Sequence, residues 1–179
     1  MDFNKLYEDL QPYIISVYKG GSRRIPFLTN NHDYDYEIYV RPDMPKNFAP
    51  KIFKDRTRGE DIYVRRDGDN VEIGFWSWSL KYGEPIVGEN IFENFDFFAI
   101  KDRWLEVAYQ IFTKYKFFDD KYGGTIKRWY HILSGLYVLE NGCYDFTEKQ
   151  IAKIQLLHDR QGTQEIYEEI QELLKKYCC

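Results

Sequence analysis

Residues 20–40, GGSRRIPFLTNNHDYDYEIYV, combine a Gly-Gly-Ser turn with two aspartates that stand one residue apart. Successive side chains of a β-strand point to opposite faces, so Asp33 and Asp35 are predicted to share one face, about 6.6 to 7 Å apart. Two carboxylates held that close repel each other unless a cation neutralises them. Their oxygens are donors that hard divalent cations prefer, so the pair predicts a site for Mg²⁺ or Mn²⁺.

The residues before the turn, YIISVY at 13–18, are β-branched and aromatic and predict a strand that runs directly into the glycines. Because glycine has no Cβ, Gly20 and Gly21 allow a tight turn whose backbone N–H groups, with the Ser22 hydroxyl, suit phosphate oxygens. Arg23 and Arg24 add positive charge beside this turn. A phosphate-binding turn followed by metal-binding acids predicts a site for a nucleoside triphosphate and its metal ion.

A third acid has two candidates. Residues 61–78 are predicted to form a hairpin, with strands at 61–66 and 71–76 joined by the turn DGDN. Glu72 stands in the second strand between Val71 and Ile73, an arrangement that would anchor the acid in a sheet. Asp61, at the start of the first strand, is the competing candidate.

The order and spacing of these features resemble those of nucleotidyltransferases of the DNA polymerase β superfamily, whose motif is a glycine-serine turn, an Asp-x-Asp strand and a later third acid between apolar residues. Three further segments resemble a bacterial and phage branch of predicted nucleotidyltransferases: WSWSLKYGEPI at 76–86, KRWYHIL at 127–133 and ENG at 140–142. The family more often has Asp as its third acid, and Glu72 reaches one methylene further.

This resemblance implies a transferase that moves a nucleoside monophosphate from ATP or another nucleoside triphosphate to an acceptor hydroxyl and releases pyrophosphate. It implies that Asp33, Asp35 and Glu72 hold the metal ions and carry out catalysis, and that residues 20–24 bind the nucleotide. The acceptor stays open among RNA, protein and small molecules, and so does the choice of base.

The alternative is a catalytically weak or inactive module of the same fold, antitoxin-like or nucleic-acid-binding. Taken singly, the glycine turn is an ordinary tight loop and the aspartates are an ordinary exposed strand face, and only their combination favours the enzyme. A nucleic-acid-binding module would use exposed aromatics such as Trp76 and Trp78 and a local group of basic residues, namely Lys51, Lys54, Arg56, Arg58, Arg65 and Arg66.

The hydrophobic pattern predicts an α+β fold, with a small mixed β-sheet as the catalytic core in residues 1–100 and a helical subdomain in residues 101–179. Residues 33–40 are predicted to form a strand and residues 43–60 an irregular insertion. Helices are predicted at 2–10, around 104–112, and at 126–140, 147–160 and 163–177.

The helical part contains Lys127 and two histidines, His131 and His158. Lys127 and His131 lie one helical turn apart and are possible residues of a cleft between the two parts. A lone histidine on an apolar helix is more often partly buried with a local hydrogen bond, and that interpretation is favoured for His131. His158 is predicted to face solvent.

Net charge, cysteine content and hydropathy limit the partners and the cellular compartment that the sequence predicts. The formal net charge is only -4, so no overall electrostatic signal favours nucleic acid or membrane as a partner. Three cysteines without metal-ligand spacing predict a reducing compartment and no zinc site. The terminal Cys178-Cys179 pair resembles a prenylation signal, although an unmodified tail is favoured. Without a leader pattern or an apolar run of ~18 residues, we expect a cytoplasmic protein with no membrane span.

Overall fold

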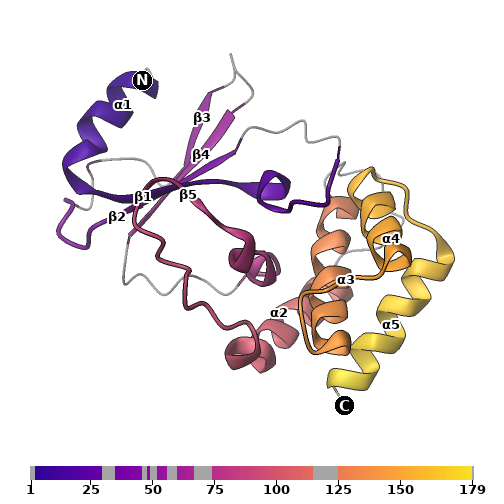
Figure 1. Cartoon of the computed structure of the whole chain (residues 1–179). Coiled ribbons are helices and arrows are strands. Elements are labelled where there is room, and N and C mark those ends of the chain that lie inside the picture. Colours follow the sequence, from indigo (N-terminus) through magenta and orange to yellow (C-terminus); the bar gives the residue numbers. More distant parts are fainter. Residues whose placement is uncertain are drawn as a thin grey trace. The chain divides into compact units, whose positions relative to one another are not determined.

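A computed structural model describes residues 3–29, 35–45, 48, 52–55, 60–66, 74–114 and 125–178. The chain divides into two units, one made of Met1–Glu72 with Ser79–Phe95 and the other of Ile73–Trp78 with Asp96–Cys179. The sheet lies in the first unit and helices α2 to α5 in the second (Figure 1). The predicted α+β class, a small mixed sheet with a helical C-terminal part, is confirmed. The predicted boundary lay between residues 100 and 101, whereas the helical unit here includes residues 73–78 and resumes at residue 96.

The first unit is built on a five-stranded sheet with the strand order β3-β4-β2-β1-β5. Strand β2 runs parallel to β4, whereas the other neighbouring strands are antiparallel. The end of β1 and the beginnings of β2 and β4 therefore meet at one edge of the sheet. The strands are β1 (Ile14–Lys19), β2 (Tyr36–Val40), β3 (Ile52–Asp55), β4 (Glu60–Arg66) and β5 (Pro85–Gly88).

Apolar side chains cover both faces of this sheet. Alternation along β1 and β2 places Val17 and Ile38 on one face, where they pack with Leu10 of helix α1 (Phe3–Leu10). The same alternation places Tyr18 and Tyr39 on the other face. There they pack with two residues that follow in the chain, Leu80 of a 3₁₀ helix (Ser77–Tyr82) and Phe92. A polar side chain that points to this second face of the sheet is therefore shielded from solvent by the aromatic rings.

Two predictions about the strands were wrong. Residues 52–55 lie within the predicted irregular insertion, yet they form β3 and pair antiparallel with β4. A four-residue strand with a charged second half is too short for its alternation to be recognised. In the predicted second hairpin strand, 71–76, the described residues 74–76 include a turn, and the residues that follow, 77–82, form the 3₁₀ helix. The alternating WSWS sequence imitates a strand, but the Trp78 side chain is fully buried in the helical unit.

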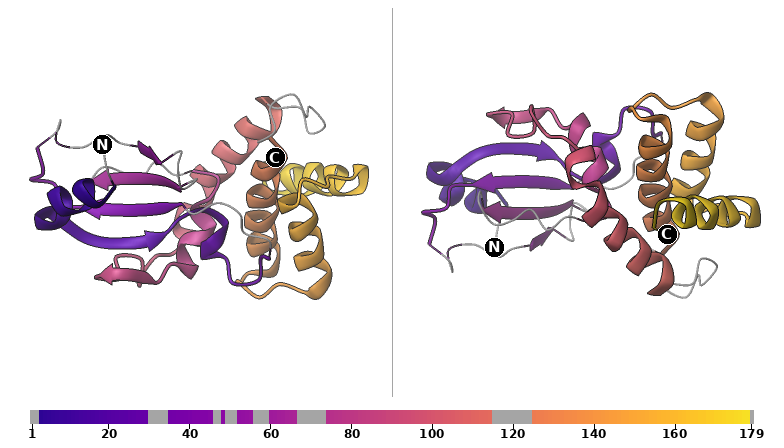
Figure 2. Two further views of the ribbon diagram at one scale, coloured as in Figure 1. Left: turned by 90° about the horizontal axis from the view of Figure 1, so that it is seen from above. Right: turned by 90° about the horizontal axis from the view of Figure 1, so that it is seen from below.

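The second unit consists of helices that agree with the predicted ones to within a few residues. They are α2 (Lys101–Lys114), α3 (Thr125–Asn141), α4 (Glu148–His158) and α5 (Gln164–Cys178). A capping box between Thr147 and Gln150 begins α4, which satisfies N–H groups that a helix start leaves open. Helices α3 and α4 run alongside each other and α5 crosses them (Figure 2). Short 3₁₀ helices lie at Gln11–Tyr13, Gly21–Arg24 and Phe98–Ile100.

Helix α3 approaches α2 closely at Gly135. A Cβ atom at this position would lie 2.2 Å from Cζ2 of Trp104, whose side chain is fully buried and donates from Nε1 to the Phe75 carbonyl at 3.1 Å. The Trp104 ring therefore has little freedom to withdraw. Glycine at this position gives the indole its space.

We expect Gly135→Ala to destabilise the protein by about 1 to 3 kcal/mol, the usual cost of an extra carbon in a packed core. Helix propensity alone predicts the opposite sign, because alanine is better than glycine in a helix interior by about 1 kcal/mol. Urea unfolding followed by far-UV circular dichroism measures the difference. An alanine variant more stable than the wild type would contradict this account of the α2 and α3 contact.

Candidate functional site

The glycine turn and Asp35 lie against each other at the sheet edge. The Gly20 N–H donates to the Asp35 carbonyl at 2.7 Å. A Cβ on Gly20 would lie 2.9 Å from the Asp35 Cβ, so a side chain there would force the two segments apart. Gly21 has a φ of +56°, and its Cβ would lie 3.1 Å from Oδ2 of Asp35. Both glycines are thus needed to bring the turn and this carboxylate together.

The residues that complete the turn differ in exposure. The Gly21–Arg24 segment forms a 3₁₀ helix in which Gly21 is exposed and Ser22 is buried. Arg23 is partly buried, with its guanidinium carbon 5.5 Å from the centre of the Tyr36 ring. Arg24 is buried and ion-pairs with Glu37 instead of extending beside the glycines. Among the predicted nucleotide-binding residues, the Arg24 side chain is therefore directed into the interior, and the Gly20 N–H is already bonded to the Asp35 carbonyl.

Of the predicted acids, Asp35 is described, whereas Asp33 and Glu72 lie outside the described residues. Strand β2 begins at Tyr36, so Asp35 immediately precedes it. The competing third acid, Asp61, is the second residue of β4, and the parallel register pairs Tyr36 with Ile62. Asp35 and Asp61 each precede a member of this pair, which makes them neighbours at the edge that carries the glycine turn.

Tyr63 reports on both acids. Burial raises the pKa of the Tyr63 phenol to about 12, and the negative charges of Asp35 and Asp61 contribute in the same direction. The strand positions agree, because Asp61 stands two residues before Tyr63 on β4 and Asp35 immediately precedes the residue paired with Ile62. The two carboxylates lie at the starts of neighbouring strands, next to glycines that have no side chain. Carboxylate oxygens are suitable ligands for Mg²⁺ or Mn²⁺. No group of three or more His, Cys, Asp or Glu side chains with metal-ligand geometry occurs among the residues that the structure describes.

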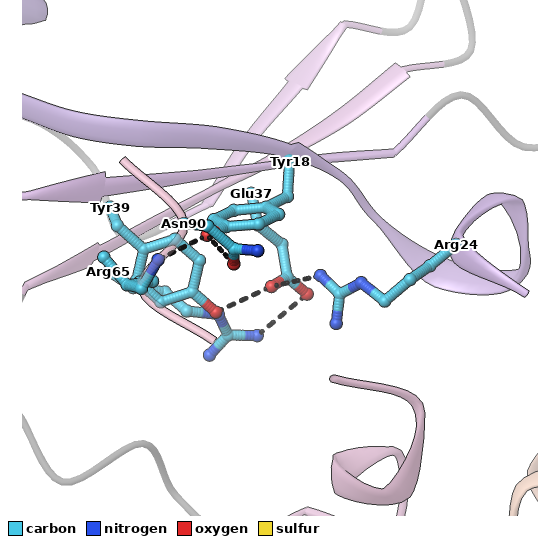
Figure 3. A network of polar contacts seen from close by, with 7 residues as sticks. Tyr18, Arg24, Glu37, Tyr39, Arg65 and Asn90 are labelled. Carbon is cyan, nitrogen blue, oxygen red and sulfur yellow. Dashed lines mark hydrogen bonds and ion pairs between the residues drawn. The ribbon is translucent and has the colours of Figure 1, made fainter. Parts of the chain in front are cut away.

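A buried ionic cluster, the Glu37 cluster, lies two residues along β2 from Asp35 and comprises Arg24, Glu37, Tyr39 and Arg65. The Arg24 Nη2 donates to Glu37 Oε2 at 2.9 Å, and the Tyr39 hydroxyl donates to the same oxygen at 2.8 Å. The Arg65 Nη2 lies 3.7 Å from the other carboxylate oxygen. Figure 3 shows both guanidinium groups directed at this carboxylate. The exposed fractions of the Arg24 and Glu37 side chains are only 3% and 7%.

Electrostatics keep Glu37 ionised in this cluster. Burial alone would raise the pKa of its carboxyl group, but the charges of Arg24 and Arg65 and the hydrogen bonds from Arg24 and Tyr39 lower it below its usual value. Burial and the neighbouring Glu37 charge raise the pKa of the Tyr39 phenol, which therefore stays a donor. The result is a charged carboxylate held inside the unit by two hydrogen bonds, from Arg24 and Tyr39, and by a longer ion pair with Arg65.

Sequence reasoning missed Glu37, although a signal was present. Glu37 continues the alternation of acids begun by Asp33 and Asp35, and it stands between the apolar residues Tyr36 and Ile38. That is the pattern which singled out Glu72. No comparable signal points to its partners, because the pairing with Arg24 and Arg65 depends on the turn and on the register of β4.

Both histidines that the sequence analysis considered in the helical unit are buried. His131 is buried and accepts a hydrogen bond on Nδ1 from Trp78 Nε1 at 3.2 Å, as the local interpretation predicted. The side chain of Lys127 lies outside the described residues. The prediction that His158 faces solvent was wrong, because its exposed fraction is 5%. Trp78 is fully buried, so it is not one of the exposed aromatics that a nucleic-acid-binding surface would use.

The described helices include none with the length and apolar character needed to cross a membrane. Comparison with known proteins adds no relative: no family model, curated protein or solved structure matches the chain.

Proposed function

We propose that this chain is a metal-dependent nucleotidyltransferase that transfers a nucleoside monophosphate from a nucleoside triphosphate to an acceptor hydroxyl and releases pyrophosphate. The observation that carries the proposal is the packing of the Gly20-Gly21 turn against Asp35. A turn suited to phosphate and a carboxylate suited to a metal come from separate segments and meet at one sheet edge. The pairing of β1 with β2 explains why the two backbones meet, but it does not require two glycines where a Cβ would contact the Asp35 side chain. This combination favours the enzyme over the structural alternative.

Exposure supports the same assignment. Gly21 is exposed and Asp35 and Asp61 are partly exposed, so a ligand from solvent can approach them. The Glu37 carboxylate is buried and ion-paired with two arginines, so it is not a candidate metal ligand. In this proposal Asp35 and Asp61, together with Asp33, would hold Mg²⁺ or Mn²⁺. When bound, the metal would neutralise phosphate charge and lower the pKa of the acceptor hydroxyl.

Asp61 is the third acid that the strand register favours, because β4 lies parallel and adjacent to β2. Glu72 stays a prediction. In this assignment Asp61 accepts the proton of the acceptor hydroxyl while the new P–O bond forms and the bond to pyrophosphate breaks. The N–H groups of Gly21 and Ser22 donate to the phosphate oxygens, and the Arg23 guanidinium supplies positive charge beside them.

Thermal unfolding with and without ligand tests this function. The wild-type protein is heated alone and with ATP, GTP, CTP or UTP, in the presence and absence of magnesium or manganese. A triphosphate at ~100 times its dissociation constant adds ~2.7 kcal/mol to the free energy of unfolding. We expect at least one triphosphate to raise the melting temperature only when metal is present.

The matched protein for this test is the Asp33→Ala/Asp35→Ala double variant, which should unfold at the same temperature with and without ligand. A metal-dependent rise in the wild type that persists in the double variant would place the nucleotide elsewhere. No rise with any triphosphate would contradict the proposal and favour the inactive module of the same fold.

A further inference from the structure

The Glu37 cluster connects the three segments that carry the candidate site. Arg24 is the last residue of the 3₁₀ turn that contains Gly21 and Ser22, and its guanidinium is directed back to Glu37 on β2. Arg65 reaches the same carboxylate from β4, four residues after Asp61. One side chain therefore joins the glycine turn, the strand after Asp35 and the strand of the third acid.

Aromatic rings from β1 and from the segment after β5 also enclose the cluster. The Arg24 guanidinium carbon lies 6.0 Å from the centre of the Tyr18 ring and 6.0 Å from that of Phe92. The Tyr18 hydroxyl in turn accepts from the Ile91 N–H at 2.9 Å, which fixes the segment that covers the cluster. Arg24 is thus held by an ion pair at its end and by aromatic rings along its side.

Stability alone is a poor reason for such an arrangement. Removing two charges from water is costly, and replacing a buried ion pair by apolar side chains of similar volume is often neutral or stabilising. Apolar contacts are not directional, whereas an ion pair with hydrogen bonds fixes the position of the segment that carries it. In this cluster the segment is the Gly21–Arg24 turn, whose N–H groups would face the phosphate groups of the proposed nucleotide.

We propose that Glu37 and Arg24 are positioning residues that hold the Gly21–Arg24 turn in register with Asp35 and Asp61. This inference rests on the proposed function, because the turn needs an accurate position only if it binds a ligand together with those acids. Glu37 touches neither substrate nor metal in this scheme. Loss of the cluster should weaken nucleotide binding and loosen the turn without unfolding the sheet.

The test compares the wild type with Arg24→Met/Glu37→Met, which removes both charges and keeps apolar volume. Two quantities are measured: the dissociation constant of ATP, GTP, CTP and UTP with magnesium, and the hydrogen exchange rates of the backbone amides in residues 20–25. We expect the dissociation constant to rise about 10-fold or more, as for residues that orient ligand-binding groups. Amide exchange in the turn should also accelerate about 10-fold, while exchange in β1 and the melting temperature stay close to wild type.

A matched control exists in the helical unit. There the Glu169 carboxylate accepts from Lys153 Nζ and from the Tyr137 hydroxyl, so it combines a carboxylate, a cation and a tyrosine as Glu37 does. Lys153→Met/Glu169→Met should leave nucleotide affinity and exchange in residues 20–25 unchanged. If Arg24→Met/Glu37→Met does not fold, Arg24→Met/Glu37→Gln takes its place, since glutamine keeps an acceptor for the Tyr39 hydroxyl and no buried Arg24 guanidinium is left without its carboxylate.

The outcomes separate this inference from the function on which it rests. A folded variant that binds triphosphate as tightly as the wild type, with unchanged exchange in the turn, overturns the positioning role and leaves the nucleotidyltransferase proposal intact. A wild-type protein that binds no triphosphate with magnesium overturns both. Faster exchange together with weaker, still Asp35-dependent binding supports both.

Discussion

Replacing Asp35 by asparagine is expected to slow pyrophosphate release from a nucleoside triphosphate by on the order of 10²- to 10³-fold, the loss typical of a removed electrostatic group in an active site. Asparagine has the same shape but lacks the charge that would balance a metal ion. The backbone carbonyl of residue 35, which accepts the Gly20 N–H, is retained. We therefore expect the variant to fold with a free energy of unfolding within about 0.5 kcal/mol of the wild type.

The measurement is pyrophosphate release with magnesium, using water or added RNA as the acceptor. Asp43→Asn is the matched control, because Asp43 is an exposed aspartate of the same unit that ion-pairs with Arg41 at 2.7 Å. It should release pyrophosphate at the wild-type rate. Wild-type turnover in Asp35→Asn would exclude this carboxylate from catalysis.

The same assay identifies the third acid. Asp61→Asn and Glu72→Gln each remove one candidate charge with little change of shape. The register of β2 and β4 leads us to expect the larger loss for Asp61→Asn. A larger loss for Glu72→Gln would restore the assignment that the sequence pattern favours.

The elements of the fold differ in how far the sequence predicts them. Helices α2 to α5 were predictable because a helix of 11 or more residues repeats its apolar pattern over several turns. Strand β3 was not, because four residues carry little periodicity. Residues 74–76 were mistaken for the end of a strand because alternation is a local signal, and the structure has a turn there instead.

The features of the candidate site also differ in how far the sequence predicts them. The meeting of Gly20 with Asp35 was predictable once residues 13–18 and the residues after Asp35 were expected to be neighbouring antiparallel strands, because the two residues continue the pairing of Lys19 with Tyr36. The choice of Asp61 depends on a parallel register between β2 and β4, which the sequence does not reveal. The role of Arg24 was misread for a related reason. An arginine next to glycines in the sequence suggests a phosphate ligand. In the structure, the packing around Arg24 directs its guanidinium to Glu37 instead.

The largest effect on stability is expected at Glu37. Glu37→Ala leaves the Arg24 guanidinium buried without its carboxylate partner, and breaking a buried ion pair from one side costs about 3 to 5 kcal/mol. The Arg24 side chain is only 3% exposed, so it cannot regain water without moving the turn. Urea unfolding at pH 7 should show this loss. The matched control is Glu140→Ala, which breaks an exposed ion pair with Lys176 and should cost far less.

The pH dependence of this loss follows from the direction of the pKa shift. The pKa of Glu37 lies below its usual value of 4.5 in the folded protein, because the arginine charges and hydrogen bonds outweigh the effect of burial. A group with a lowered folded pKa contributes its full stability above its unfolded pKa and loses it as the pH falls through the folded pKa. The difference in unfolding free energy between wild type and Glu37→Ala should therefore be constant at neutral pH and shrink below a pH of about 4.5. A difference that stays the same at pH 7 and at about pH 3 would mean that the Glu37 charge does not stabilise the cluster. In that case the link from the glycine turn to β2 would rest on apolar packing around Arg24 alone.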